Sequence, residues 1–161
     1  MPGPMVVLAL VLASLLPSKG VFVPHESLAG IRLGTTPAQV RAKLGSHYTV
    51  CNDCASPSWF YFRNTGFTGN ETGLGVSFRR GRVAAVYTLG YPRGWRTPQG
   101  LVVGHEQQRL PKLYGSQLRL SVCIGYVAHS QRRPTSVSTF FTMESFVSGF
   151  SLTLPSEPVC R

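Results

Sequence analysis

Four cysteines are the residues whose spacing most directly suggests chemistry in this chain. Cys51 and Cys54 form a C-N-D-C motif, and Cys123 and Cys160 lie far downstream. A zinc site would need a second ligand pair at finger-like spacing, which the sequence lacks. A redox CxxC normally opens a helix after a buried strand, whereas a loop of Ala, Ser and Pro follows Cys54. An even count in a small exported chain is typical of disulfides, and of the three possible pairings we favour Cys51–Cys54 and Cys123–Cys160.

Groups for acid, base or nucleophilic catalysis are scattered along the sequence. The six carboxylates fall in six separate segments, at Glu26, Asp53, Glu71, Glu106, Glu144 and Glu157. His105 and Glu106 begin a motif that resembles the zinc-binding HExxH, but Arg109 stands at the second histidine position and cannot bind a metal. The sequence contains no G-x-S-x-G motif and no P-loop. We therefore expect no catalytic residue, no metal and no cofactor, and we interpret the chain as a non-enzyme.

Aromatic residues of the predicted strands and connector are the first candidates for binding a partner. The candidates are Trp59, Tyr61, Tyr87 and Trp95. On a concave sheet face ringed by arginine they would resemble the side chains that commonly anchor interfaces. The alternative is that alternate members of residues 59–62 belong to the core. This pattern favours a protein-binding module whose partner is another exported or envelope protein of unknown identity.

The net charge suggests a second kind of partner. The chain has 16 Lys and Arg against 6 Asp and Glu, a formal net charge of +10. Such a surface attracts anionic polymers, phospholipid headgroups and acidic proteins. The alternative function is therefore a basic envelope-associated protein that binds anionic wall polymer or a lipid surface. Its candidate anion-binding residues are Arg79, Arg80, Arg82, Arg93, Arg96, Arg132 and Arg133, unless these charges serve only solubility.

The N-terminus predicts export. Residues 5–16 form an apolar run of signal-peptide length, shorter than the roughly 20 residues of a membrane span. Ser18 and Gly20 are small residues at −3 and −1 of a cleavage site before Val21, and an uncleaved anchor is the alternative. No later segment is apolar enough to span a membrane. We expect a secreted or extracytoplasmic protein, and export argues against a nucleic-acid partner.

One short pattern occurs twice at a constant offset. Residues 30–45 and 100–115 both begin with Gly-x-x-x-Gly and end in glycine, with an apolar pair between. Self-similarity at one offset without gaps predicts a duplicated unit. We expect a signal peptide at 1–20, a first repeat at 21–95 and a second repeat at 96–161.

Each repeat is expected to begin with a short helix and continue as strands. Thr36, Pro37 and Gln39 have the residue types of a capped helix start, and Gly45 ends that helix. In the second copy Pro111 falls inside the helix and should kink it. The expected strands lie near residues 59–62, 74–78, 83–89, 118–124, 136–142 and 146–154. The predicted fold class is α+β, with two tandem units, each a short helical segment packed on a small antiparallel sheet.

The stretch GIRLGTTPAQVRAKLG at residues 30–45 resembles the GMTRxQVxxxLG signature of the SmpA/OmlA lipoprotein fold. It is also similar to the tandem-repeat beta-lactamase inhibitory proteins of soil actinobacteria. The matching positions are Thr36, Gln39, Val40 and Gly45. The connector at 96–104 and the hairpin at 78–83 look like uncharacterised exported actinobacterial proteins of the same build. These positions are caps, turns and core, so the resemblance implies a fold and suggests a function only by analogy.

The inhibitory proteins act through a sheet face and a hairpin loop with an acidic tip. The corresponding loop here spans residues 63–73, and the resemblance implies that Phe67 and Glu71 are presented to a partner. A solvated connection between strands is the alternative interpretation of this loop. The resemblance has limits, since SmpA/OmlA proteins are single-unit lipoproteins and the inhibitors place their cysteines differently. Together these patterns predict an exported, disulfide-bonded protein that acts as an inhibitor-like or other protein–protein interaction module.

Overall fold

The structure is a computed structural model that describes residue 16 and residues 19–63 and 71–161. The expected signal peptide, apart from its last residues, and Phe67 therefore lie outside the described residues. Within the described ranges no helix is long and apolar enough to cross a membrane.

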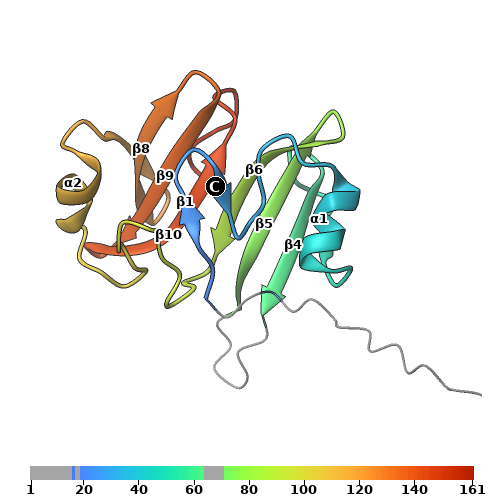
Figure 1. The fold of residues 1–161 in the computed structure, drawn as a ribbon, viewed down its shortest axis with the longest axis horizontal. Coiled ribbons are helices and arrows are strands. Elements are labelled where there is room, and N and C mark those ends of the chain that lie inside the picture. The colour runs from blue at the N-terminus through green and yellow to red at the C-terminus, as the bar shows by residue number, and fades with distance from the viewer. Residues whose placement is uncertain (1–15, 17–18, 64–70) are drawn as a thin grey trace, which may run out of the picture.

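The described chain begins with a small hairpin and then alternates helix and strands (Figure 1). The hairpin consists of β1 (Phe22–Val23) and β2 (Ser27–Leu28). Helix α1 (Pro37–Leu44) precedes β3 (Thr49–Cys51), β4 (Ser58–Arg63), β5 (Thr72–Arg79) and β6 (Arg82–Leu89). Helix α2 (Arg109–Tyr114) precedes β7 (Arg119–Cys123), β8 (Tyr126–Arg133), β9 (Ser136–Met143) and β10 (Phe146–Thr153). The six strands expected from the sequence correspond to β4, β5, β6, β7, β9 and β10, whereas β8 was not predicted.

Eight strands form one antiparallel sheet in the order β3-β4-β5-β6-β10-β9-β8-β7. The last strands of the two halves, β6 and β10, pair at its centre, with Ser151 opposite Tyr87 and Leu152 opposite Val86. This pairing gives hydrogen-bond partners to backbone groups that would otherwise line two exposed strand edges. The two halves of the chain therefore share one sheet and one hydrophobic core.

The predicted fold class is wrong. The protein is mostly β, with one large sheet and helices of 8 and 6 residues, and it does not consist of two separate helix-on-sheet units. Pairing between β6 and β10 joins the two expected sheets, and so short a helix cannot cover half of the result. Hairpin β1–β2 and the connector between the halves cover the centre instead.

The helix-side face of the sheet holds the hydrophobic core. Phe22 of the hairpin stacks between two strands, with its ring centroid 5.6 Å from that of Phe140 and 5.1 Å from that of Phe150. Val40 of α1 and Leu110 of α2 are also buried against this core. Each such side chain contributes about 1.5–3 kcal/mol when it leaves water. Four segments far apart in sequence thus contribute to covering the same face.

The opposite face, called here the tail-side face, is covered in part by the C-terminal segment at residues 154–161. The Leu154 amide donates to the Ala84 carbonyl at 2.8 Å, which starts the segment across the sheet. Beneath it lie the hydroxyls of Thr139, Ser151 and Thr153, buried and without hydrogen-bond partners among the described atoms. Buried hydroxyls of this kind are unusual for a core, so the tail-side face is a polar interior.

The two helix starts differ as the sequence suggests, but with a different consequence. Thr36 and Gln39 form the expected capping box, with the Thr36 amide donating to Gln39 Oε1 at 3.0 Å. Helix α2 has no side-chain cap and begins at Arg109, so Pro111 lies in its first turn. Amides of the first turn have no partner within the helix, so proline there costs no helical hydrogen bond. The expected kink inside the second helix is therefore wrong.

Both favoured disulfides are present. Cys51 is bonded to Cys54, and Cys123 to Cys160. Cys51 is the last residue of edge strand β3, and Cys123 is the last residue of edge strand β7. The first bond closes a local turn, whereas the second fastens the C-terminal segment to the sheet.

Candidate functional site

The four aromatic candidates do not form an exposed surface. Tyr61 and Trp95 are each 2% exposed and Tyr87 is 7% exposed. Trp59 is half-buried and stacks on Tyr48, with ring centroids 4.1 Å apart. Burial, followed by the nearby Tyr48, raises the pKa of Tyr61 to about 12. Strand register places Trp59 and Tyr61 on the helix-side face and Tyr87 on the tail-side face, so these residues act chiefly in packing.

The loop between β4 and β5 lies partly outside the described residues. Glu71, at its end, is exposed. Phe67 lies outside the described ranges. A partner contact by this loop therefore stays a prediction.

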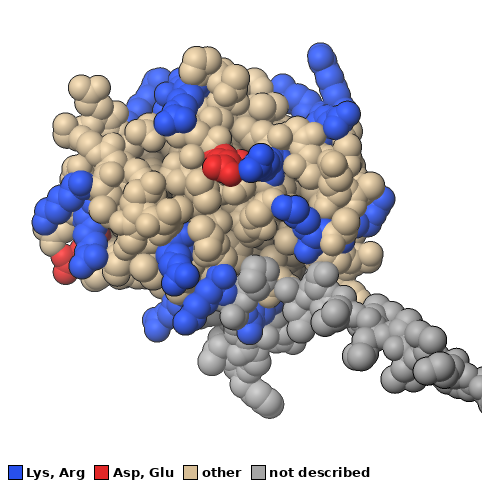
Figure 2. All heavy atoms as spheres, viewed as in Figure 1, with Lys and Arg blue, Asp and Glu red and all other residues tan. Residues whose placement is uncertain are grey.

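Five of the seven candidate arginines gather at one end of the sheet. Arg79, Arg80 and Arg82 flank the turn between β5 and β6, and Arg132 and Arg133 precede the turn between β8 and β9. Both turns lie at the same end because Thr153 pairs with Ala85 on one side and with Val137 on the other. Arg93 and Arg96 follow β6 and belong to the opposite end. Figure 2 shows Lys and Arg around the rim of the face that carries the helices, with few Asp or Glu among them.

Several of these arginines already have partners. Arg79 forms an ion pair with Glu157 at 3.0 Å. Arg82 donates to the Gly34 carbonyl at 3.3 Å, and Arg132 donates to the Pro155 carbonyl at 3.2 Å. All three remain exposed. Solvent-exposed pairs of this kind contribute little, so these guanidinium groups keep capacity for an anion.

A serine, a histidine and an amide meet where hairpin β1–β2 crosses strands β8 and β9. His25 Nδ1 lies 2.8 Å from Ser136 Oγ, and His25 Nε2 lies 3.1 Å from Gln131 Oε1. The His25 amide also donates to Ser138 Oγ at 2.7 Å. Burial lowers the pKa of His25; the hydrogen bond to Gln131 opposes that shift and the charge of Arg133 adds to it.

This cluster has the connectivity of a nucleophile, a base and an orienting group, but its chemistry differs from that of a catalytic triad. Gln131 is neutral and cannot stabilise an imidazolium as a carboxylate does. Ser136 is 4% exposed, which leaves little room for a substrate. We interpret the cluster as the anchor of the hairpin. Among the described residues no three His, Cys, Asp or Glu side chains are placed to hold a metal ion.

The most exposed apolar side chains of the described chain follow edge strand β7. Leu120 is 62% exposed, Val122 is 87% exposed, and Ile124 in the following turn is 100% exposed. Leu120 pairs with His129 and Val122 with Val127, which places both side chains on the helix-side face. β8 is the neighbour of β7 on one side, and the structure places no described strand on the other. An edge with apolar side chains and free backbone groups is a template for another strand.

The second face of β7 has the opposite character. Arg119 and Ser121 alternate with the apolar residues and point to the tail-side face. The C-terminal segment stands opposite them, held by the Cys123–Cys160 disulfide and by Tyr126, whose hydroxyl contacts the backbone of Arg161. Strand β7 therefore presents an apolar row on one face and a cationic, hydroxylated row on the other.

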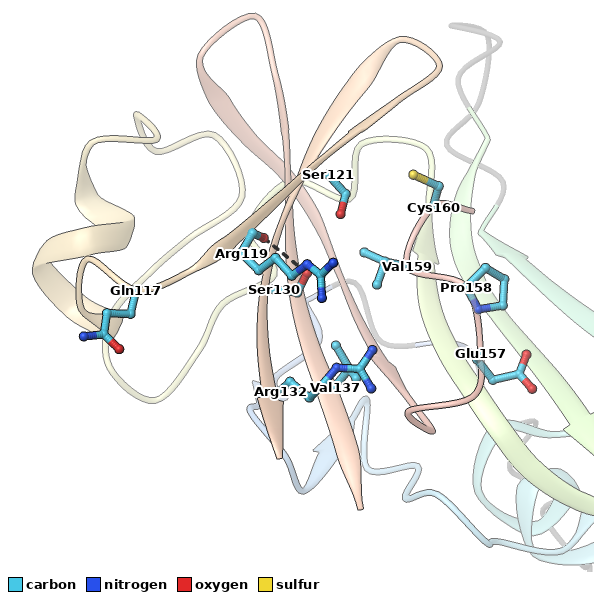
Figure 3. A pocket seen from close by; sticks show the side chains of 10 residues that line it. All are labelled: Gln117, Arg119, Ser121, Ser130, Arg132, Val137, Glu157, Pro158, Val159 and Cys160. Atoms are coloured by element: carbon cyan, nitrogen blue, oxygen red, sulfur yellow. Dashed lines mark hydrogen bonds between the residues drawn. The ribbon is translucent and has the colours of Figure 1, made fainter. Parts of the chain in front are cut away.

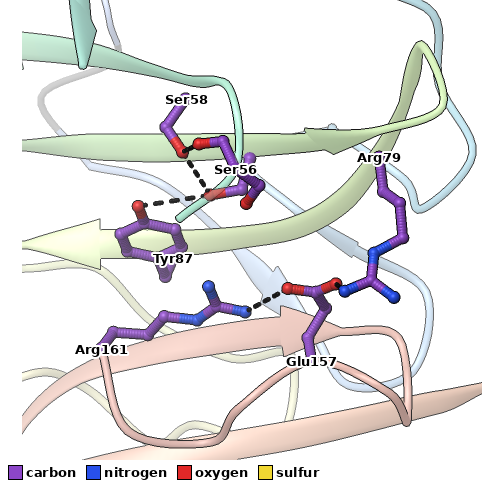
Figure 4. Close-up of polar contacts among 7 residues, drawn as sticks. Ser56, Ser58, Arg79, Tyr87, Glu157 and Arg161 are labelled. Carbon is purple, nitrogen blue, oxygen red and sulfur yellow. Dashed lines mark hydrogen bonds and ion pairs between the residues drawn. The ribbon is translucent and has the colours of Figure 1, made fainter. Parts of the chain in front are cut away.

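An ion network holds the C-terminal segment across the sheet (Figure 4). The Glu157 side chain, 4% exposed, lies 3.0 Å from Arg79 and 3.6 Å from Arg161. The Arg161 guanidinium also lies over the Tyr87 ring, 5.1 Å from its centroid. Gly75 makes room for that ring, because a Cβ at this position would lie 2.4 Å from it. The segment is thus fastened at both ends, by charge near Glu157 and by the disulfide at Cys160.

Sequence reasoning missed the residues of β7. Leu120, Val122 and Ile124 have the types of ordinary strand residues, and their exposure depends on which strand forms the edge. Arg119 was not among the candidate arginines. One signal was available, because the alternation Arg-Leu-Ser-Val-Cys gives a strand with two different faces.

Comparison with known proteins gives a fold without a family. No known family and no curated protein matches the sequence. A DUF4309 family protein of Bacillus subtilis has a similar structure, with a TM-score of 0.52 and 15% identity over 74% of this chain and 78% of that one. None of the described structural neighbours is named as an SmpA/OmlA protein or a beta-lactamase inhibitory protein, so that resemblance stays a prediction.

Two further similar structures contain additional parts. An extracellular protein of Bacillus anthracis with an SCP domain has a TM-score of 0.52 and 11% identity, over 76% of this chain and 44% of that one. A cysteine-rich secretory protein of Staphylococcus aureus has a TM-score of 0.50 and 13% identity, over 89% and 49%. This chain spans less than half of either. Their extracellular descriptions and the two disulfides agree with an extracytoplasmic location.

Proposed function

We propose that this chain is an extracytoplasmic, non-enzymatic binding protein that accepts an extended segment of a partner protein along strand β7. The exposed apolar row of Leu120, Val122 and Ile124 on a sheet edge is the observation that carries the proposal. In such strand addition the main chain supplies hydrogen bonds, and alternate side chains supply specificity. An inhibitor-like action would follow if the bound segment belonged to the working part of another exported protein.

The two faces of β7 define the chemistry of that partner. A residue paired with Leu120 or Val122 would gain from being apolar, whereas a residue beside Arg119 would gain from being acidic. The formal net charge of +10 favours acidic partners more generally and speeds their approach. The segment that fits is therefore an extended strand that alternates apolar and acidic residues.

A peptide of four Val-Glu repeats tests this reading directly. We expect it to bind the mature protein and to slow hydrogen exchange of the β7 amides. The double variant Leu120→Ser/Val122→Ser should weaken binding about tenfold, because it removes the apolar row from an exposed position. Val50→Ser is the matched control, since Val50 lies on the opposite edge strand and is 49% exposed.

Two outcomes would reject strand addition at β7. One is equal binding by the double variant and the wild type. The other is equal binding by a peptide whose alternate amides are methylated, since that peptide cannot add as a strand. With material from the source organism, a protein retained by wild type and by Val50→Ser but lost from the double variant would identify the natural partner.

The arginine-rich end of the sheet supports a second candidate function, binding of an anionic wall polymer or lipid surface. Arg79, Arg80, Arg82, Arg132 and Arg133 meet there from two turns. Such binding should fall steeply with salt, whereas strand addition should change little. Vesicles of phosphatidylglycerol, with Arg80→Gln/Arg133→Gln as the variant, test it by co-sedimentation at low and high salt.

A further inference from the structure

A cavity of about 690 Å³ lies between the outer strands of the second half and the C-terminal segment (Figure 3). Residues of β7, β8 and β9 form one wall, and residues 157–160 form the other. The Cys123–Cys160 disulfide closes one end by joining the two walls. Its volume falls within the range of pockets that bind small molecules. It lies on the tail-side face, opposite Leu120 and Val122, so it is distinct from the proposed strand-binding edge.

Two arginines give the cavity its charge. Arg119 faces Ser130, and Arg132 stands two residues further along the same strand, so the two guanidinium groups come from diagonal positions on adjacent strands. In Figure 3 both extend from the strands toward the C-terminal segment. Among the described residues neither forms an ion pair with a carboxylate. Their charges are therefore available to a bound anion.

The one carboxylate side chain of the lining does not cancel these charges. Glu157 belongs to the C-terminal wall, but its oxygens lie 3.0 Å from Arg79 and 3.6 Å from Arg161. Figure 4 shows it held between these two side chains. Two cations thus already balance Glu157, and the field in the cavity is positive.

The remaining lining suits a ligand that also carries hydroxyl groups. Ser121, Ser130 and Gln117 offer hydroxyl and amide groups beside the arginines, whereas Val137 and Val159 supply apolar contact. Ser130 Oγ donates to the Arg119 carbonyl at 3.4 Å, a long bond that leaves its acceptor positions open. Arginine pairs bind phosphate and carboxylate with two parallel hydrogen bonds each.

We propose that this cavity binds a small polyhydroxylated organic anion, such as a sugar phosphate or a sugar acid. Phosphate and carboxylate share the chemistry that two guanidinium groups recognise, and the sugar hydroxyls match the serine and amide groups. The site depends on the C-terminal segment, because one wall of the cavity belongs to it.

Calorimetry with glucose 6-phosphate, glucuronate, glucose and inorganic phosphate tests the proposal on the full mature protein. We expect one of the two sugar anions to bind more tightly than both glucose and inorganic phosphate. Arg132→Gln should weaken that binding at least about tenfold, since a charged hydrogen-bond donor is lost. Arg133→Gln is the matched control, because it removes the same charge one residue away, on the opposite face of the sheet.

The result that overturns the proposal is equally specific. Equal weakening by Arg132→Gln and Arg133→Gln would mean that net charge, not the cavity, attracts the anion. Binding of glucose or inorganic phosphate as tight as that of the sugar anions would reject the ligand class, and no binding of any probe would reject the site. Both arginines are exposed, so the variants should fold, and an unchanged melting curve verifies it. Leu120→Ser/Val122→Ser should bind the anion normally, which separates this test from that of strand addition.

Discussion

Strands β3 and β7 are the two edges of the same sheet, and each ends in a cysteine. β3 has three residues and turns at once into the loop closed by Cys51–Cys54. β7 has five residues, and its cysteine reaches 37 residues along the chain to Cys160. A short edge that ends in a tight loop offers little to another strand, whereas β7 offers a full row of backbone groups.

The difference shows two ways to use a disulfide at a sheet edge. At β3 the bond shapes a turn and leaves one half-exposed apolar residue, Val50. At β7 it brings a distant segment beside the edge, which creates a cavity on one face and leaves Leu120 and Val122 open on the other. The first edge is blunted, and the second combines two recognition surfaces on one strand.

Removing each disulfide gives the largest expected contrast between the edges. Cys123→Ser/Cys160→Ser should lower the free energy of unfolding by about 4 kcal/mol on the loop-entropy relation, because the closed loop is long. Cys51→Ser/Cys54→Ser should cost about 2 kcal/mol on the same relation. Chemical denaturation of both double variants measures the difference. Equal losses would mean that the β7 bond does not organise the C-terminal segment, and the cavity would lose its physical basis.

The second prediction concerns the charge that fastens the same segment. Glu157→Gln should lower the free energy of unfolding by about 2 kcal/mol, since it leaves two arginines beside a neutral, buried side chain. Glu26→Gln breaks an exposed pair with Arg32 and should cost less than about 0.5 kcal/mol. Thermal melts of both variants at one salt concentration provide the measurement. A loss for Glu157→Gln as small as that for Glu26→Gln would show that the disulfide alone holds the segment.

Local chemistry was predictable from the sequence because neighbouring residues determine it. The capping box at Thr36 and Gln39, the pairing of the cysteines and most strands follow from residue types and short spacings. β8 was missed because its second half, Ser-Gln-Arg-Arg, lacks the β-branched and aromatic residues that mark strands. Its backbone pairs with β7 and β9 all the same, since tertiary context overrides propensity.

The fold class and the candidate site could not be predicted because both depend on strand order. Nothing near Tyr87 or Ser151 in sequence indicates that they face each other at the centre of one sheet. The exposure of Val122 likewise depends on β7 being an edge, and the role of Arg119 depends on a segment some 40 residues away. The aromatic candidates failed for the converse reason: the same side chains that anchor interfaces also fill cores, and residue type does not distinguish the two.

The smallest expected effect concerns pH and the half of the sheet next to β7. His129 of β8 pairs with Leu120 across the strands, and its Nε2 lies 2.9 Å from Thr142 Oγ1. Burial lowers the pKa of His129, and it also lowers that of His25. The unfolded chain titrates these groups near pH 6.5, above their folded values, so it takes up protons first as the pH falls. Stability should therefore be complete above about pH 6.5 and decline as the solution becomes more acidic.

Replacing the two histidines should flatten that decline. His25→Asn/His129→Gln keeps hydrogen-bonding side chains at both positions but removes the groups that titrate in this range. Denaturation at several pH values between about 7 and 5 should show a shallower slope for the double variant than for the wild type. An identical slope would assign the acid sensitivity elsewhere. It would also mean that hairpin β1–β2 and strand β8 stay in place when protonated, so that the β7 edge remains supported in acidic surroundings.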